Sequence, residues 1–598
     1  TAVHLLQYRH PTRSAVPYLH EALRRDAGDS RAATALGSWH LARGEYAAAR
    51  DLLEAATAQL TRRNLNPRDG EAAYLLGLVH ERLGDDHAAD RCLAKAAWNA
   101  AFAPAAILAR ARIALRAGST ATAPGLARSA APIPAAGRLR ALALARRGEG
   151  AASVARVAEL LAADPLDPAT RALAGESIDR DARTALEVGA EFARAGAVDE
   201  ALAATAATVE RTPSAGLAGP LRHYLRAHWL ERSGRAAEAD DERSLGRGTS
   251  TTLAFPAGLD HFDALVAAVA ADPHDVVAAG LLGMWLLDAG RHADALAHLR
   301  CATEGGSTDP VVWRNLAIAL VAVDDDEAAA DAALAHALSL RPDARLLLER
   351  DVLAVRRGTD AATRLSLLEA HAVLLDARDD LAVRHANLLL DVGRTDEAWI
   401  LLTTRRFRPF EGGEGLVIAA YDRAACRLAE RMLETAPADA VSLLESGFVP
   451  PRTLGEGRHP AERPVQRWVL LGAARAAAGD AAGAAEAWRT AVAPSPLAVA
   501  PRAADESTYW TGVAHLHLAD ATSAASAWDA LDARATALRA ASDEVDYFAT
   551  SVPELTSFEA ATATARAAMA DRLERLAERG RAQQLAARPV DVSERTRT

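Results

Sequence analysis

One spacing pattern, which returns about every 34 residues, constrains this chain more than any other feature. A small residue is followed twelve positions later by alanine and sixteen positions later by a large apolar residue; clear copies start at Gly37, Gly77, Gly283, Gly472 and Gly512. Glycine inside a helix costs about 1 kcal/mol relative to alanine, so its recurrence implies helix backbones that approach closely. Each copy predicts two antiparallel helices that meet through small residues, with the large residue filling the groove toward the next pair.

The turns and the composition agree with this interpretation. Glycine follows the first helix of many copies, as in Arg43-Gly44-Glu45 and Ala289-Gly290-Arg291. Half of the residues are hydrophobic but only 5% are aromatic, which favours helices packed through small side chains. The pattern resembles the tetratricopeptide repeat (TPR). It predicts an all-α, TPR-like, right-handed superhelical solenoid of antiparallel helix pairs.

Three interruptions of the period suggest how the array is divided. The period is lost between Asp241 and Asp260, and two later stretches are rich in glycine, proline and arginine. The predicted parts are an N-terminal TPR-like array at 1–240, a linker or loop at 241–260, a second array at 261–555 with Gly-rich loops at 405–415 and 449–464, a capping helix at 556–585 and a disordered tail at 586–598.

Charge and motifs exclude several classes of function. The net charge is −11 with both signs mixed along the chain, so a nucleic-acid partner is not expected. No apolar stretch is long enough to span a membrane. The three cysteines lie far apart, which predicts no zinc site or disulfide, and buried thiols in a reducing cytoplasm. No phosphate-binding, dinucleotide-binding or metalloprotease motif occurs, so no cofactor and no metal are expected. Lysine occurs only at Lys95, an arginine bias that indicates a high-GC bacterial genome.

Several segments carry more specific sequence than helix packing requires. They contain the candidate partner- or ligand-binding residues, which are His10, Arg13, Asn66, Asp69, Trp98, Asn99 and Tyr547, and three glutamates of the Gly-rich loops, which are Glu411, Glu414 and Glu456. Paired carboxylates about 5–10 Å apart are what glycoside hydrolysis requires, so these glutamates are the only candidate catalytic residues.

These segments, together with Trp313-Arg314-Asn315-Leu316 and Arg378-Asp379-Asp380-Leu381, resemble the helical half of a bacterial family. Its members join an N-terminal β-rich domain of unknown function to a long TPR array and occur in carbohydrate-related contexts. The β-rich half is similar to the sugar-mutarotase type of sandwich. The resemblance extends from Gln7 to about Phe548. Two features depart from it: Phe410 stands where the family often has tryptophan, and residues 462–467 are plainer than their Tyr/Asn-rich counterpart. The resemblance implies a companion β-rich domain or a carbohydrate as partner.

Each candidate also has a purely structural interpretation. Asp69 fits a helix N-cap and Glu71 the positive start of that helix. Trp98 fits core or interface packing, and Asn99 a helix C-cap. The three loop glutamates fit solvated acids, and alternatively they contact a sugar or a docked β-rich domain.

Two hypotheses of function follow. The favoured one is an interaction scaffold that binds a protein partner or a companion domain in its concave groove, without a catalytic centre in this chain alone. The other is the helical half of a glycoside-processing or glycan-binding protein, which would act only with an additional domain. The second hypothesis requires one surface to contain seven of the candidates, namely His10, Arg13, Asn66, Asp69, Glu411, Glu414 and Glu456.

Overall fold

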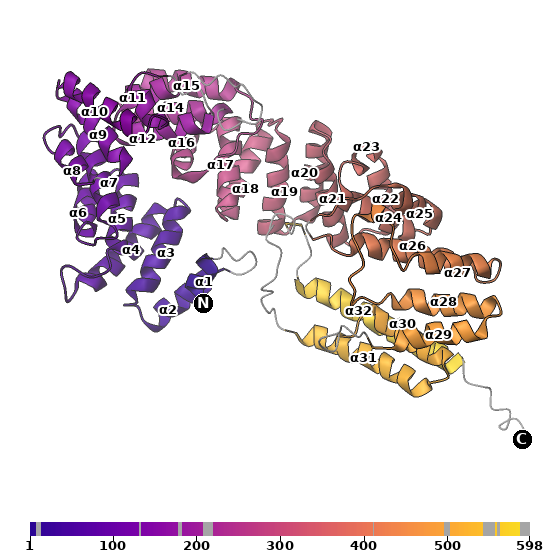
Figure 1. Cartoon of the computed structure of the whole chain (residues 1–598). Helices are drawn as coiled ribbons and strands as arrows, with labels where there is room; N and C mark the ends of the chain where they lie inside the picture. The colour runs from indigo at the N-terminus through magenta and orange to yellow at the C-terminus, as the bar shows by residue number, and fades with distance from the viewer. Residues whose placement is uncertain are drawn as a thin grey trace, which may run out of the picture. The chain divides into compact units, whose positions relative to one another are not determined.

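The computed structural model describes residues 1–7, 14–130, 133–176, 182–206, 219–410, 412–494, 503–541, 557–558 and 562–586. Within these ranges every regular element is a helix (Figure 1). The chain forms two compact units, Thr1–Leu340 and Arg341–Thr598, which are described separately below. None of the described helices combines the length and the apolar character needed to cross a membrane.

The N-terminal unit contains twenty helices. They are α1 (Ala2–Gln7), α2 (Val16–Arg25), α3 (Ser30–Ala42), α4 (Tyr46–Thr61), α5 (Glu71–Arg82), α6 (Asp86–Ala96), α7 (Ala103–Arg116), α8 (Ala123–Ser129), α9 (Pro134–Arg146), α10 (Gly150–Ala163), α11 (Pro168–Leu173), α12 (Ala182–Arg194), α13 (Val198–Ala204), α14 (Gly219–Arg232), α15 (Ala236–Gly248), α16 (Gly258–Ala271), α17 (Val276–Asp288), α18 (His292–Glu304), α19 (Pro310–Asp324) and α20 (Glu327–Leu340), counted over the described residues.

The C-terminal unit is built from twelve α-helices and one 3-10 turn, again counted over the described residues. They are α21 (Ala344–Arg356), α22 (Ala361–Glu369), α23 (Ala372–Leu375), α24 (Asp379–Asp391), α25 (Thr395–Thr404), α26 (Leu416–Met432), α27 (Pro437–Ser446), the turn Arg452–Leu454, α28 (Val465–Ala477), α29 (Ala481–Val492), α30 (Glu506–His517), α31 (Ala521–Ala540) and α32 (Thr562–Ala586).

Consecutive helices pair as the spacing pattern predicts, which confirms the TPR-like solenoid of antiparallel helix pairs. A Cβ atom added to Gly77 of α5 would lie 2.6 Å from Cγ of Leu93 on α6, and Gly283 of α17 stands in the same relation to Leu299 of α18. The alanine twelve residues after each small residue is buried. The large residue therefore packs first against the glycine of its own pair, and it also touches the next pair. The expectation that it fills only the groove toward the next pair was incomplete.

The expected linker at 241–260 is shorter in the structure. Helix α15 continues to Gly248 and α16 begins at Gly258, so only residues 249–257 are non-helical. The apolar period fails in α15 because polar contacts hold that helix instead: Glu242 binds Arg226 and His223 of α14, and the buried Arg243 binds Glu231. The division between the compact units falls after Leu340.

At the C-terminal end of the chain, α32 packs against α31, where the fully buried Trp528 lies between Gly512 of α30 and Gly580 of α32. Figure 1 shows α26 to α31 stacked as successive pairs. Of the predicted tail at 586–598, residues 587–598 lie outside the described residues.

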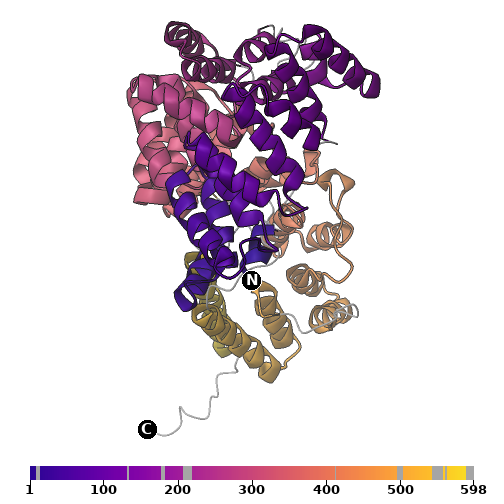
Figure 2. The ribbon, with the colours of Figure 1, turned by 90° about the vertical axis from the view of Figure 1, so that its left-hand side faces the viewer.

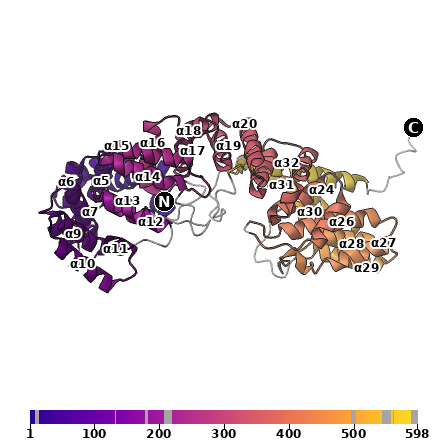
Figure 3. The same cartoon turned by 90° about the horizontal axis from the view of Figure 1, so that it is seen from above.

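Within the N-terminal unit, α3 to α19 follow one another around an arc (Figures 1 and 3). The arc closes on itself. Arg291, after the turn between α17 and α18, donates to the carbonyl oxygen of Arg43 at 3.1 Å, and Arg43 donates to the carbonyl oxygen of Ala289. Figure 2 shows the indigo and pink ends of this unit side by side. The first helices of the pairs therefore face a common interior.

Candidate functional site

Arginine ends the first helix of five successive pairs in the N-terminal unit. Each of these arginines lies in the last turn of its helix, where positive charge is favoured by the helix dipole; they are Arg82, Arg116, Arg146, Arg194 and Arg232. Two of them cap neighbouring helices. Arg116 donates to the carbonyl oxygen of Arg194 at 2.6 Å, and Arg146 to that of Leu115 at 2.9 Å. These contacts join the inner ends of helices from different repeats.

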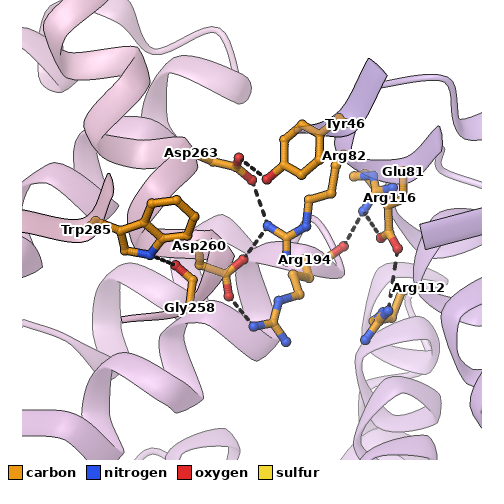
Figure 4. Close-up of polar contacts among 10 residues, drawn as sticks. All are labelled: Tyr46, Glu81, Arg82, Arg112, Arg116, Arg194, Gly258, Asp260, Asp263 and Trp285. Carbon is orange, nitrogen blue, oxygen red and sulfur yellow. Dashed lines mark hydrogen bonds and ion pairs between the residues drawn. The ribbon is translucent and has the colours of Figure 1, made fainter. Parts of the chain in front are cut away.

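Helix α16 brings two carboxylates into this arginine-rich interior (Figure 4). Nη1 of Arg82 lies 2.8 Å from Oδ1 of Asp260 and 2.7 Å from Oδ2 of Asp263. Arg194 binds the second oxygen of Asp260, and the Tyr46 hydroxyl donates to Asp263 at 2.6 Å. Because Arg82 and Asp260 are 178 residues apart, this cluster ties one end of the arc to the other.

Burial and the charges in the interior shift the pKa values of its titratable side chains. Burial alone would raise the pKa of Asp260, but the charges and hydrogen bonds of Arg194 and Arg82 outweigh it and hold that pKa well below its usual range. At Asp263 burial dominates, and the pKa is raised despite Arg82 and Tyr46. Burial, reinforced by Arg232, lowers the pKa of His228 to about 4, so this imidazole is neutral at pH 7.

The interior contains two adjoining cavities of about 810 Å³ and about 500 Å³. Arg112, Ala190, Arg194 and Asp260 line both of them, so the two form one continuous hollow. The wall of the larger cavity combines aliphatic side chains of the first helices with the non-helical segment before α16; these residues include Leu108, Leu139, Leu186, Leu225, Leu253 and Phe255. We call this continuous space the interior hollow.

Arg112 of α7 is the least satisfied charged group of the interior hollow. Its side chain is only 18% exposed, yet no described residue makes a hydrogen bond with it, and its nearest carboxylate oxygen is that of Glu81 at 3.6 Å (Figure 4). Its Nε is buried without a partner, as are Nε of Arg194 and Nδ1 of His228. Burial lowers the pKa of Arg112, but arginine stays protonated in proteins. The hollow thus holds a guanidinium whose counter-charge, Glu81, lies 3.6 Å away and is shared with Arg116 at 3.2 Å.

Four of the residues singled out from the sequence gather elsewhere in the same unit, around the start of α5 and the end of α6. Asn66, Asp69, Trp98 and Asn99 line one small surface depression there. Lys95 donates to Oδ1 of Asn66 at 3.1 Å, and the Asn99 side chain donates to the carbonyl oxygen of Arg68. The structure brings these four together, and their role in binding stays a prediction.

The helix-cap and packing roles expected for these residues agree with the structure only in part. The N-cap of α5 is Gly70, one residue later than predicted, but the Asp69 carboxylate does accept the Glu71 amide at 2.9 Å. Trp98 is 75% exposed, so the interpretation as core packing was wrong. It lies just after the C-cap residue of α6, Ala97.

The two Gly-rich loops of the C-terminal unit meet, although they are far apart in sequence. The Phe407 amide donates to the Thr453 carbonyl oxygen at 2.7 Å, and both Phe407 and Leu454 are buried. The Glu456 carboxylate accepts the amides of Gly415 at 2.7 Å and Ile418 at 3.0 Å, so it caps the start of α26. We call residues 405–410, 412–418 and 449–458 the loop junction. Glu414 is exposed there.

The remaining candidates, His10, Arg13, Glu411 and Tyr547, lie outside the described residues. Of the seven residues that the carbohydrate hypothesis requires on one surface, Asn66 and Asp69 belong to the N-terminal unit, and Glu414 and Glu456 to the C-terminal unit. In the N-terminal unit the structure brings together Asn66 and Asp69, which are close in sequence, and in the C-terminal unit Glu456 accepts the amide of Gly415, the residue after Glu414.

The residues of the interior hollow were not singled out from the sequence. One signal was present. Arginine stands five positions after the small residue in five repeats, for example Arg82 after Gly77 and Arg194 after Gly189. This regularity distinguishes the N-terminal unit from a solenoid built for packing alone.

Comparisons with known proteins give only distant matches. No protein-family model matches the chain. Among solved structures, yeast Tom70 shares 12% identity over 95% of this chain and 99% of its own, with a TM-score of 0.22. A structure of Naa15/Naa10 bound to HypK-THB shares 13% over 98% of each chain, with a TM-score of 0.22. The TPR domain of P58(IPK) shares 13% over 83% of this chain and 99% of its own, with a TM-score of 0.19. The assignment of the fold rests on the helix pairing described above.

Proposed function

We propose that the protein is an interaction scaffold, and that the interior hollow of the N-terminal unit holds a segment of a protein partner. The observation that carries this proposal is the combination of exposed apolar side chains and unsatisfied guanidinium donors on one concave surface. Stacked helix pairs present such surfaces to extended peptides and to other domains. Each of the two cavities has a volume in the range of ligand-binding cavities.

The non-helical segment before α16 supports the proposal. Phe255 is 52% exposed and Leu253 is 42% exposed, and both line the larger cavity. Leu253 has a φ of 59°, a left-handed conformation that costs a non-glycine residue about 1–2 kcal/mol. A segment that only connects α15 to α16 has no need of large apolar side chains at the wall of a cavity or of backbone strain. Both features suit a contact surface.

The carbohydrate hypothesis rests on the family resemblance alone. Its candidate Glu456 is engaged by two backbone amides, which is a helix-capping role. The companion β-rich domain is likewise an inference from the resemblance. We place the interaction in the cytoplasm, because the free thiols of Cys92, Cys301 and Cys426 suit a reducing compartment.

Filling the hollow tests the proposal. Ala190 of α12 lines both cavities and is nearly buried, so Ala190→Trp places an indole where they join. Ala47, on the outer helix α4, is exposed and gives a matched control in Ala47→Trp. The full chain carrying each substitution is cross-linked to its cellular partners, which are identified by mass spectrometry. Partners common to the unmodified chain and Ala47→Trp should be lost from Ala190→Trp. An unchanged set of partners with Ala190→Trp contradicts the proposal.

A further inference from the structure

Resting on the proposed function, we infer that the interior hollow recognises an acidic side chain of the partner segment, and that Arg112 is the residue that binds its carboxylate. The inference names the chemistry of the occupant, an Asp or Glu next to a large apolar residue.

The first argument is the count of donors and acceptors. A guanidinium carries five N–H donors, and an unpaired buried polar group costs about 1–3 kcal/mol, more when it is charged. Arg112 is held only by its 3.6 Å ion pair with Glu81 among the described residues, and the Nε atoms of Arg112 and Arg194 are both buried without a hydrogen-bond partner. Native structures satisfy nearly all such groups, so those that remain call for an acceptor. A carboxylate supplies two oxygens to a planar fork of donors.

The second argument is the charge around the smaller cavity. Five arginines line it against three carboxylates; the arginines are Arg82, Arg112, Arg116, Arg194 and Arg232, and the acids are Glu81, Asp260 and Asp263. The acids are already engaged. Asp260 and Asp263 bind Arg82, and Glu81 binds Arg116 at 3.2 Å. The smaller cavity therefore has an excess of positive charge, which favours an anionic occupant.

The third argument comes from the residues of this chain that already lie in the interior, at and just before the start of α16. Asp260 projects from α16 toward Arg82 and Arg194, while Leu253 and Phe255, just before it in sequence, line the larger cavity. An acidic residue with apolar neighbours is thus the chemistry that this surface already accepts. A partner segment of the same kind would place its acid at Arg112 and its apolar side chain against Leu108 and Leu186.

The experiment uses two hexapeptide libraries and the full chain. Both libraries carry Leu or Phe at positions two and five. The acidic library has Asp or Glu at positions three and four, and the neutral library has Asn or Gln there. Retention on the chain is measured by mass spectrometry after ultrafiltration. Arg112→Gln removes the charge. Arg110→Gln, on the same helix, removes an arginine that binds Asp90 outside the hollow.

We expect the acidic library to be retained and the neutral library to pass. Arg112→Gln should lower retention about tenfold to a hundredfold, the loss expected for charge-assisted hydrogen bonds, whereas Arg110→Gln should not. Arg112→Gln should change the melting temperature little, because the ion pair that it removes is long, at 3.6 Å, and Glu81 keeps its closer partner Arg116 at 3.2 Å. Should it melt lower, Arg112→Lys, which keeps the charge but not the fork, should still reduce retention.

Three outcomes overturn the inference. Equal retention of both libraries excludes recognition of an acid, and so does retention that Arg112→Gln leaves unchanged. Inorganic phosphate that stabilises the chain through Arg112 and displaces the acidic library identifies a phosphate site instead. All three leave the scaffold proposal standing as long as Ala190→Trp still removes the cross-linked partners. Failure of the Ala190→Trp experiment is what removes the scaffold itself.

Discussion

The loop junction and the interior hollow differ in what the residues that are conspicuous in the sequence do there. In the loop junction, segments that looked functional in the sequence have structural roles: Glu456 caps α26, and Phe407 and Leu454 are buried. In the interior hollow, Arg194 at the end of α12 and Arg112 within α7 each keep a buried Nε without a partner. Conspicuous sequence therefore marks a structural joint in one unit, whereas the candidate site of the other unit lies among residues that were not singled out from the sequence.

The buried ion pairs next to the loop junction also have a structural role. Arg467 of α28 is fully buried and binds Asp422 of α26 at 2.6 Å, while Arg458 binds the other oxygen of Asp422 at 2.7 Å. Arg467 also donates to the Leu444 carbonyl oxygen at 3.0 Å. These groups leave little for a ligand to bind. The comparison predicts that substitutions in the loop junction affect stability and that substitutions in the interior hollow affect binding.

The largest expected effect is that of Asp422→Ala. It leaves the buried Arg467 without its counter-charge, which should cost about 3–5 kcal/mol in the free energy of unfolding. Chemical denaturation followed by tryptophan fluorescence measures the change. Asp396→Ala, which breaks an exposed pair with Arg431, is the control and should cost less than about 1 kcal/mol. Equal effects of the two substitutions would show that the loop junction is not a structural joint.

A pH effect is expected in the interior hollow. The pKa of His228 is lowered to about 4, against about 6.5 in an unfolded chain. At a pH between these two pKa values, the unfolded chain binds a proton at His228 and the folded chain does not. The free energy of unfolding therefore falls as the pH is lowered from about 6.5 to about 4. The loss attributable to His228 should reach about 1–3 kcal/mol, allowing for its partial exposure.

Replacing the imidazole isolates this contribution. His228→Gln should flatten that part of the pH dependence of unfolding, measured by denaturant titration at pH 7 and pH 5. His274 is exposed, so His274→Gln serves as the control and should leave the pH dependence as it is. Identical pH profiles for His228→Gln and the unmodified chain would mean that the imidazole is not held neutral in the hollow.

Glu456→Ala should have a smaller effect, confined to one helix. Loss of a side chain that caps a helix start costs about 0.5–2 kcal/mol. Hydrogen exchange should accelerate at the first turn of α26, which contains the capped amide of Ile418. Glu414→Ala, an exposed acid of the same loop, is the control and should change neither exchange nor stability. Unchanged exchange in Glu456→Ala would remove the capping role and return the residue to the list of candidate ligand contacts.

Trp98→Ala should have the smallest effect on stability. The ring is 75% exposed, so its removal should change the free energy of unfolding by less than about 0.5 kcal/mol. Trp528→Ala, which empties a fully buried position, should cost about 3–5 kcal/mol in the same assay. A large loss of stability on removal of Trp98 would restore the interpretation of that residue as packing.

The fold was predictable because it depends on local spacing. The contact of Gly77 with Leu93, sixteen residues away, repeats in other pairs, and each copy can be read without knowledge of the rest. The extent of α15 was missed because that helix is held by Glu242 and Arg243 and not by apolar residues. A pattern based on hydrophobicity does not detect such a helix.

The candidate site was less predictable because it depends on contacts between distant residues. Arg82 on α5 meets Asp260 on α16 only because the helix pairs from α5 to α15 curve until their ends touch, and the curvature accumulates over many small rotations. Asn66 and Asn99 could be expected near each other, since they lie in the segments just before and just after the antiparallel pair α5 and α6. The convergence of Phe407 with Thr453 was not foreseen, although both loops were singled out.

Hydrogen exchange of the full chain, followed by mass spectrometry with and without the most strongly retained acidic peptide, tests the central claim most directly. The account predicts slower exchange in α7, in α12 and in residues 253–258, and no change at residues 412–418 or 452–458. Protection at the loop junction, or none in the helices that line the interior hollow, would contradict it.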